Sequence, residues 1–289
     1  MRIVMTLLVR DEEDIIEWNL RYHLSRGVDH FVVTDNQSVD GTVEILREYE
    51  RQGVVTYVHE PDDDFSQDRW VTGMTVLAQS KLQPDWLIHS DADEFWWPES
   101  AASLDELFGS VRRWRRAVRV DRCDFLGPSR HADEPFFKRM IYRVRQPRNL
   151  LGYPLPPKVA HRPLEDPYIH QGNHRVSTGG RVLRPRRLKG ISILHFPART
   201  PDQLRNKVMR GGAAYESNTR FDETVGSTWR RMYRSQRNGE LGRLIDAHFL
   251  DPKAADDRDV IEDRRLADYL AELSPVSSDR RDGPRDGDR

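Results

Sequence analysis

Two carboxylates stand two residues apart in Asp91-Ala92-Asp93, directly after the apolar run Trp86-Leu87-Ile88. Carboxylate oxygens suit hard divalent cations such as Mg²⁺ or Mn²⁺, which proteins usually hold with one or two carboxylates plus substrate phosphates. If the apolar run is a buried strand, the pair lies at its carboxyl end, where open α/β sheets bind their ligands. A solvated acidic loop or a helix N-cap would also give this local pattern.

Polar and acidic residues follow two other apolar runs in the first third of the chain. Arg10-Asp11-Glu12-Glu13 comes after Ile3–Val9, and Asp35 comes after Phe31–Thr34. A carboxylate fixed at a strand end, such as Asp35, can accept a hydrogen bond from a base N–H, whereas Asp40 in the following turn is typical of a helix entry. Because the carboxyl ends of parallel strands meet at one edge, the three groups are expected to converge on one nucleotide-binding crevice.

The elements that must position these groups alternate along the chain. Apolar runs predict strands at Ile3–Val9, Phe31–Thr34, Val54–Val58 and Trp86–Ser90. Amphipathic stretches predict helices at Asp14–Arg26, Asp40–Gly53 and Asp68–Ser80. Strands that alternate with helices of this length indicate an α/β protein with a mostly parallel sheet and right-handed crossovers.

The second half of the chain is less regular. Its patterns predict helices at Leu104–Trp114, Asp202–Tyr215 and Val225–Phe249, and strands at Ala117–Asp121, Met140–Val144, Arg181–Arg184 and Ile191–His195. We expect a catalytic domain over residues 1–199 and a C-terminal helical segment over residues 200–273. Residues 274–289 lack apolar anchors and are expected to be a disordered tail.

Composition narrows the class of protein. The chain has 289 residues, of which 37% are hydrophobic and 32% charged, and its net charge of −1 gives no global attraction to nucleic acid or to an anionic membrane. Arginines are frequent from Arg112 onward; local basic patches would suit a phosphate-bearing ligand, and a compositional bias explains them equally well. A single cysteine, Cys123, excludes an internal disulfide and a cysteine-based zinc site. The apolar start is too short to span a bilayer, so a cytoplasmic protein with at most peripheral membrane contact is expected.

Several ordered motifs resemble those of a family 2-type bacterial glycosyltransferase, over roughly residues 1 to 212. The motifs are Leu8–Trp18, Tyr22-His23, Gly27, Asp35–Thr42, Asp91–Phe95, Lys158–Pro163, Gly172-Asn173-His174 and Leu194–Arg199. One departure is Asp11, where the family usually has Asn. An acidic side chain does not donate a hydrogen bond as an amide does.

The resemblance implies a GT-A fold: a Rossmann-like, mostly parallel sheet flanked by helices, here with a C-terminal helical extension. It implies transfer of a sugar, usually with inversion, from a nucleotide-diphosphate donor to a saccharide, lipid-linked or small-molecule acceptor. Asp35 would contact the base, and Asp91 and Asp93 would form the DxD motif that holds Mn²⁺ or Mg²⁺. Such a cation neutralises the charge that develops on a diphosphate leaving group.

Further residues are candidates for the same site. His195 ends an apolar strand, as Asp91 does, and is predicted to complete the metal shell, although a core histidine would give the same pattern. His174 is expected to contact donor or acceptor, or to brace its loop. The remaining donor-binding candidates are Arg10, Glu12, Gln67, Arg69, Lys158 and Arg199; of these, Lys158 and Arg199 are cations suited to a diphosphate.

An inverting transfer needs a general base for the acceptor hydroxyl. The family places a carboxylate after the DxD motif, and Glu165-Asp166 fits by order, although a plain turn between two prolines would look the same. Glu94 lies nearer the metal motif and is the other candidate, as a residue that positions the acceptor. Trp96-Trp97 would stack on a sugar ring or belong to the core.

Two other classes of protein fit parts of the pattern. A sugar-nucleotide nucleotidyltransferase would need a glycine-rich, basic loop after the first strand, where this chain has the acidic Arg10–Asp14. A non-catalytic nucleotide-sugar-binding protein of the same fold stays open. A dinucleotide dehydrogenase is disfavoured because no GxGxxG follows the first strand. Basic residues in Asp202–Phe249 are expected to close over the donor, to face a partner or lipid-linked acceptor, or to be solvated, and nothing in the sequence demands a dimer.

Overall fold

The computed structural model of the protein describes residues 1–62, 66–128, 134–148, 153–218, 220, 222–250 and 259–273. The predicted disordered tail, residues 274–289, lies outside these ranges. Within them, no helix is both long and apolar enough to cross a membrane.

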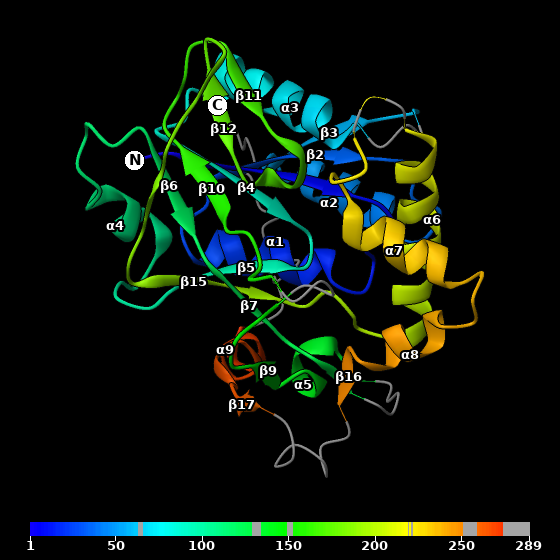
Figure 1. Cartoon of the computed structure of the whole chain (residues 1–289). Helices are drawn as coiled ribbons and strands as arrows, with labels where there is room; N and C mark the ends of the chain where they lie inside the picture. The colour runs from blue at the N-terminus through cyan, green and yellow to red at the C-terminus, as the bar shows by residue number, and fades with distance from the viewer. Residues whose placement is uncertain are drawn as a thin grey trace, which may run out of the picture.

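The protein has a mixed α/β architecture, in which helices and smaller sheets surround one central sheet (Figure 1). Among the described residues the sheet has seven strands, in the order β14 (Arg186–Arg187), β6 (Ala117–Val120), β10 (Lys158–His161), β4 (Trp86–Asp91), β1 (Ile3–Val9), β2 (His30–Asp35) and β3 (Val55–His59). The pairs β4–β1, β1–β2, β2–β3 and β14–β6 are parallel, and β10 runs antiparallel to both of its neighbours. The predicted mostly parallel sheet is thereby confirmed.

Helices cover both faces of the sheet, which explains why its strands are apolar on both sides. Alternate residues of β1 face opposite cores: Ile3 and Met5 pack in a cluster with residues of α1 (Ile16–Ser25) and α2 (Thr42–Arg51), whereas Val4 packs with α3 (Gln67–Leu82). The four strands and three helices predicted for the first half of the chain are all present, with ends within about two residues.

A second, smaller sheet lies beside the acidic motif. It contains β5 (Glu94–Pro98), β15 (Ile191–His195) and β7 (Arg122–Asp124), with β15 in the middle. Trp96 of β5 is fully buried and Trp97 stacks on the Tyr22 ring, so these tryptophans belong to the core and not to a sugar-binding surface.

Apart from the 17-residue helix α6 (Pro201–Ser217), the remaining elements are short. They are α4 (Leu104–Gly109), β8 (Gly127–Pro128), α5 (Phe136–Arg139), β9 (Tyr142–Val144), β11 (Pro167–Ile169), η1 (Gln171–Asn173), β12 (Val176–Thr178), β13 (Arg181–Val182), α7 (Ser227–Ser235), α8 (Leu241–Asp246), β16 (Phe249–Leu250), β17 (Val260–Glu262) and α9 (Arg265–Glu272). The helix predicted over Leu104–Trp114 ends at Gly109.

The C-terminal part does not form one separate helical segment. The single helix predicted over Val225–Phe249 is broken into α7 and α8, and Gly239 between them has a φ of +69°, which glycine adopts without strain. Helices α6 to α8 share a small core of their own, but β17 pairs with β9 and Leu266 and Leu270 of α9 pack in the main core. The chain therefore returns to the first domain after residue 259.

Candidate functional site

The ends of β1, β2 and β4 meet at one edge of the central sheet, as expected for parallel neighbours. Val9 lies opposite Asp35, and Leu8 lies opposite Asp91. Figure 1 shows α6 and α7 standing over this end of the sheet. We call the carboxylates gathered here, Glu12, Asp35, Asp91 and Asp93, together with their partners, the acidic edge.

Asp35 is buried at the end of β2. Its Oδ2 accepts a hydrogen bond from Tyr57 Oη at 3.2 Å, and its Oδ1 accepts one from the Ser38 backbone N–H at 3.3 Å. Burial raises the pKa of Tyr57, and the neighbouring Asp35 carboxylate raises it further. The neutral phenol thus holds one oxygen of Asp35 in place at the end of β2.

Arg10 and Asn36 join the ends of the first two strands. Arg10 Nη1 donates to Asn36 Oδ1 at 3.3 Å. Asn36 Nδ2 in turn donates to the carbonyl oxygens of Glu60 at 3.2 Å and Asp62 at 2.7 Å, in the segment after β3. Arg10 therefore lies at the predicted edge, where it braces the loops around Asp35.

Asp91 is the partly exposed member of the acidic motif, with a third of its side chain accessible. Lys158 Nζ lies 2.5 Å from its Oδ2, and Asn173 Nδ2 and Gln67 Nε2 lie 3.3 and 3.5 Å from its Oδ1. The structure thus brings the predicted Gln67 and Lys158 to Asp91, from α3 and β10.

Glu94 lies beneath this group and is fully buried. It accepts hydrogen bonds from the Asp91 backbone N–H at 3.2 Å and ion-pairs with Lys158 at 3.3 Å and Arg122 at 3.4 Å. Burial raises the pKa of Glu94, although Lys158 opposes the shift. Glu94 therefore supports Asp91 from inside the fold, where no acceptor reaches it.

Asp93 stands between a lysine and a histidine. Lys207 Nζ of α6 lies 2.8 Å from Asp93 Oδ2, and His195 Nε2 lies 3.6 Å from Asp93 Oδ1. Burial by itself would raise the pKa of Asp93, but Lys207, His195 and Arg199 outweigh it and hold the pKa below its ordinary value. Asp93 is therefore ionised, and its charge is balanced by the neighbouring basic side chains.

His195 connects Asp93 with a second carboxylate. Its Nδ1 donates to Asp124 Oδ1 at 2.6 Å. Burial favours the neutral ring, but Asp124 and Asp93 together raise the pKa of His195. A histidine whose one nitrogen is fixed by a carboxylate presents the other nitrogen in a defined direction, as metal-ligating histidines do.

Arg199 and Glu12, both predicted to bind the donor, are instead bonded to each other. Arg199 is fully buried; its Nη2 contacts Glu12 Oε2 and its Nε lies 2.6 Å from Asp14 Oδ2. Lys207 also contacts Glu12, at 3.1 Å. The guanidinium therefore fixes the start of α6 to the end of β1 and offers no free face to a diphosphate, because its donors are already used.

Helix α6 is fixed to the acidic edge at a further point. Arg210 Nη1 bonds to Asp11 Oδ2, while Asp11 Oδ1 accepts the Val39 backbone N–H at 2.8 Å. Asp11, the residue that departs from the family pattern, thus holds α6 through an ion pair that an asparagine would not make. Its backbone has a φ of +54°, a conformation that Asp tolerates better than most residues.

The predicted base candidates Glu165 and Asp166 lie elsewhere. Both are exposed, in the turn after β10. Because β10 runs antiparallel to β4, it begins at the acidic edge with Lys158 and delivers the following residues to the opposite edge of the sheet. There Leu164 hydrogen-bonds Gln79 near the end of α3. The position of Glu165 and Asp166 after the DxD motif in the sequence suggested a general base. The antiparallel direction of β10 instead places both residues far from the acidic edge.

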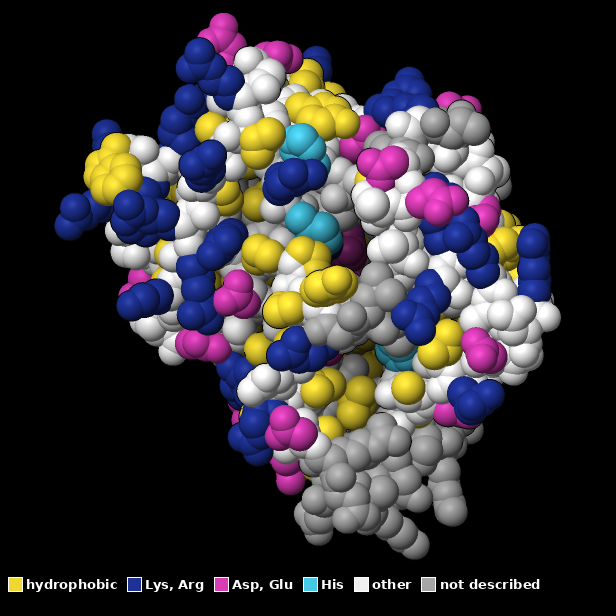
Figure 2. Space-filling model, in the orientation of Figure 1, with side chains coloured by type: hydrophobic (Ala, Val, Ile, Leu, Met, Phe, Trp, Pro, Cys, Tyr) yellow, Lys and Arg dark blue, Asp and Glu magenta, His cyan; other side chains and the backbone are white. Residues whose placement is uncertain are grey.

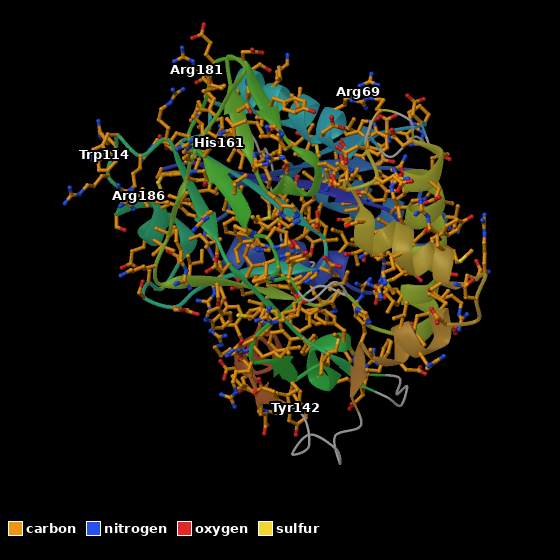
Figure 3. The ribbon with its side chains drawn as sticks, in the orientation of Figure 1. Arg69, Trp114, Tyr142, His161, Arg181 and Arg186 are labelled. Carbon is orange, nitrogen blue, oxygen red and sulfur yellow. The ribbon has the colours of Figure 1, made fainter. Side chains whose placement is uncertain are left out.

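Two other candidates occupy the borders of the site. Arg69 is exposed on the outer side of α3 and points into solvent (Figure 3). His174 Nδ1 bonds the Pro157 carbonyl at 2.9 Å, and its ring packs so closely on Gly172 that a Cβ there would lie 2.5 Å from His174 Nε2. Burial lowers the pKa of His174 well below its ordinary value. His174 braces the loop that carries Asn173.

The predicted metal set of Asp91, Asp93 and His195 is not assembled as a group. No cluster of three or more His, Cys, Asp or Glu side chains in the described ranges is arranged to hold a metal ion. The chemistry of Asp93 and His195, with Asp124 behind the ring, nevertheless fits a hard or borderline cation that completes its shell with phosphate oxygens. Arg122 and Asp124, which support this group, carry no signal in the sequence.

A family described as Glycosyltransferase family 92 matches residues 8–174. In structure the chain is similar to S. aureus TarS 1-349 (TM-score 0.44, 12% identity, 96% of this chain and 93% of that chain covered) and to the same fragment in complex with UDP (TM-score 0.45, 11% identity, 96% and 93% covered). Among curated proteins, none matches the sequence significantly.

Proposed function

The chain belongs to glycosyltransferase family 92, and from this membership we propose that it moves a sugar from a nucleotide-diphosphate donor to an acceptor hydroxyl at the acidic edge, on a sheet of GT-A type. The observation that carries the proposal is the convergence of Asp35, Asp91 and Asp93 on one end of the sheet, Asp35 from the end of β2 and the other two from the end of β4 and the turn after it. Such an edge is where α/β sheets bind nucleotides.

On the donor side, Asp35 is the group for the base. Its Oδ2 is held by Tyr57, and His59 Nδ1 lies 3.9 Å from the same oxygen, so its orientation is fixed before a ligand arrives. Asp91 is oriented by Lys158 and Asn173 and keeps a third of its side chain exposed. A fixed, partly exposed carboxylate of this kind suits the ribose hydroxyls or a metal-bound phosphate.

We assign the cation site to Asp93 and His195, with Mn²⁺ or Mg²⁺ as the metal. A divalent cation there would neutralise the charge that develops on the diphosphate leaving group. In the structure, the Lys207 ammonium supplies positive charge to Asp93 at 2.8 Å. A metal ion and Lys207 would therefore compete for the same carboxylate, because the two cations repel each other at such separations.

We propose transfer with inversion and leave the base unassigned among the residues at the acidic edge. Glu165 and Asp166 lie at the opposite edge, and Glu94 is engaged by Lys158 and Arg122. The acceptor hydroxyl must approach from the open side of Asp91, since α6 closes the side of Asp93 and Glu12.

The decisive experiment is sugar release from a panel of nucleotide sugars, with and without Mn²⁺, combined with thermal shifts in the presence of each nucleotide. Asp93→Asn should lower the rate about a hundredfold, the loss expected when a metal ligand that acts on a leaving group is removed. Asp166→Asn is the matched control at the opposite edge and should retain the wild-type rate. If no nucleotide stabilises the protein under either condition, and Asp93→Asn changes nothing, the proposal fails.

The same panel separates the other functions. A nucleotidyltransferase would release pyrophosphate from a nucleoside triphosphate and a sugar phosphate. A non-catalytic binding protein would show the thermal shift without sugar release from any donor.

A further inference from the structure

Two arginine-rich segments that are distant in the sequence form one continuous basic surface on the side away from the acidic edge. Residues 112–119 lead from α4 into β6, and residues 184–189 contain β14. β14 pairs in parallel with β6, so Arg187 lies opposite Arg119. We call these two segments the basic surface.

The charge of this surface is not a reflection of the overall composition. Residues 112–119 and 184–189 contain nine arginines and lysines and no acidic residue, whereas the whole chain has a net charge of −1. Eight of the nine are exposed, and Arg115 is half-buried. Among the described residues, only Arg187 of the nine forms an ion pair, with Asp121 at 2.6 Å. The remaining cations are available to an external anion.

The surface is hollowed where its two segments meet. The hollow has a volume of about 320 Å³ and its cationic lining is Arg112, Arg115, Arg187 and Lys189, with Val111 and Leu188 as its apolar part. Arginine forks match phosphate oxygens in geometry as well as in charge. The hollow therefore suits a phosphate group that belongs to a larger molecule with an apolar part.

An exposed tryptophan stands among the arginines. Trp114 is 64% exposed, and the Arg115 guanidinium lies 5.5 Å from the centre of its ring. Figure 3 shows Trp114 and Arg186 at the left border of the molecule, and Figure 2 shows Lys and Arg side chains gathered there. Tryptophan is favoured at the boundary between headgroups and acyl chains, while neighbouring cations attract anionic lipids.

We propose that the basic surface docks this protein on an anionic lipid bilayer, with phosphate headgroups in the hollow and Trp114 inserted at the interface. A nucleic acid is a poorer fit, because Trp114 is the only aromatic residue in the two segments and strand-binding surfaces stack successive bases on several. The docking is independent of the proposed sugar transfer: β6 starts at the edge of the sheet opposite Asp91, so the two sites are separated by the sheet itself.

The experiment is co-sedimentation of the full chain with vesicles of phosphatidylcholine alone or mixed with phosphatidylglycerol, at low and high salt. Binding should require phosphatidylglycerol and disappear at about 0.5 M salt, where charges are screened within a few ångströms. Arg112→Gln/Lys189→Gln should reduce the partition coefficient about 25-fold, since each cation near an anionic surface contributes about fivefold. Arg51→Gln/Lys81→Gln removes the same two charge types from exposed positions on α2 and α3 and should leave partitioning unchanged.

A second readout follows Trp114 itself. Vesicles that carry brominated acyl chains should quench part of the tryptophan fluorescence of the wild type, and this part should be lost in Trp114→Phe. Three outcomes would overturn the proposal: no binding to phosphatidylglycerol vesicles at low salt, equal losses in the two double variants, or quenching that Trp114→Phe leaves intact. Binding to single-stranded DNA at the same salt without binding to vesicles would also overturn it and would assign the surface to nucleic acid.

Discussion

Arginine side chains are paired and buried at the acidic edge, but they are exposed and mostly without a carboxylate partner on the basic surface. At the acidic edge Arg199 is fully buried and its donors are bonded to Glu12 and Asp14. On the basic surface Arg112 and Arg186 are exposed, with no carboxylate partner among the described residues. The difference is desolvation: a buried charge costs several kcal/mol unless it is paired, and an exposed charge costs almost nothing. A buried arginine that is paired with carboxylates therefore has a structural role, whereas an exposed arginine without such a partner can bind an external anion.

Two buried histidines on the α3 side of the sheet show a third way in which this protein treats an ionisable side chain. His89 and His161 are fully buried, their rings are 4.9 Å apart, and their Nε2 atoms have no hydrogen-bond partner among the described residues. Burial lowers the pKa of His89 well below its ordinary value and that of His161 to about 4. At these two positions no buried charge has to be paired, because the lowered pKa values keep both imidazole rings neutral.

The largest stability effect is expected from breaking the buried ion pairs. Arg199→Met should destabilise the fold by about 3–5 kcal/mol, because Glu12 is left as a buried anion with Lys207 as its remaining partner. Arg112→Met, the same substitution on the basic surface, should change the free energy of unfolding by less than about 0.5 kcal/mol. Urea denaturation of both variants measures the difference, and equal losses would refute the comparison.

The buried histidines predict a pH dependence of stability. Their folded-state pKa values lie below the value of about 6.5 in the unfolded chain, so the unfolded state binds more protons below that pH. The contribution of these two histidines to stability should be full above pH 6.5 and fall by about 1.4 kcal/mol per pH unit for each histidine below it, with His161 losing its contribution between pH 6.5 and about 4. His161→Gln should reduce this slope by one site, whereas an unchanged slope in urea titrations would contradict the assignment.

A smaller effect is expected where a cation touches the acidic edge without being fully buried. Lys207→Met should tighten Mn²⁺ binding about tenfold, since the metal no longer has to displace an ammonium group from Asp93. Arg210→Met, one turn further along α6 and paired with Asp11, is the control and should change the affinity less than twofold. Calorimetric titration with Mn²⁺ measures both; weaker binding in Lys207→Met would mean that Lys207 belongs to the site rather than competing with it.

The smallest effect is expected for the exposed tryptophan. Trp114→Ala should leave the thermal midpoint within about 2 °C of the wild type, because a side chain that is 64% exposed contributes little burial. The same variant should lose partitioning into anionic vesicles. A large drop in the thermal midpoint would show that Trp114 is needed for folding and would remove it from the docking surface.

The glycosyltransferase class was predictable because its motifs are local. Asp35 ends β2, Asp91 ends β4 and Asp93 comes two residues later, so short-range patterns placed these residues correctly at strand ends. The family whose description matches is family 92, not the family 2 type that the motifs resemble. The acidic residues at the strand ends of this chain predicted the class of enzyme and did not separate one family from the other.

The errors share a different cause. Arg199 was predicted to meet a diphosphate and Glu165 to serve as a base, yet one is buried between carboxylates and the other lies at the far edge. Both depend on how distant segments pack: the docking of α6 against β1, and the reversed direction of β10. Neither is encoded in the residues next to them.

The sequence by itself determined the alternating strands and helices, the mostly parallel sheet and the place of Asp35, Asp91 and Asp93 at strand ends, because hydrophobic periodicity is read over a few neighbouring residues. Only the tertiary structure decided which of these carboxylates are paired, that Asp124 stands behind His195, and that two arginine-rich segments join through β6 and β14. Those facts depend on contacts between residues tens of positions apart, whose desolvation sets the state of each charge.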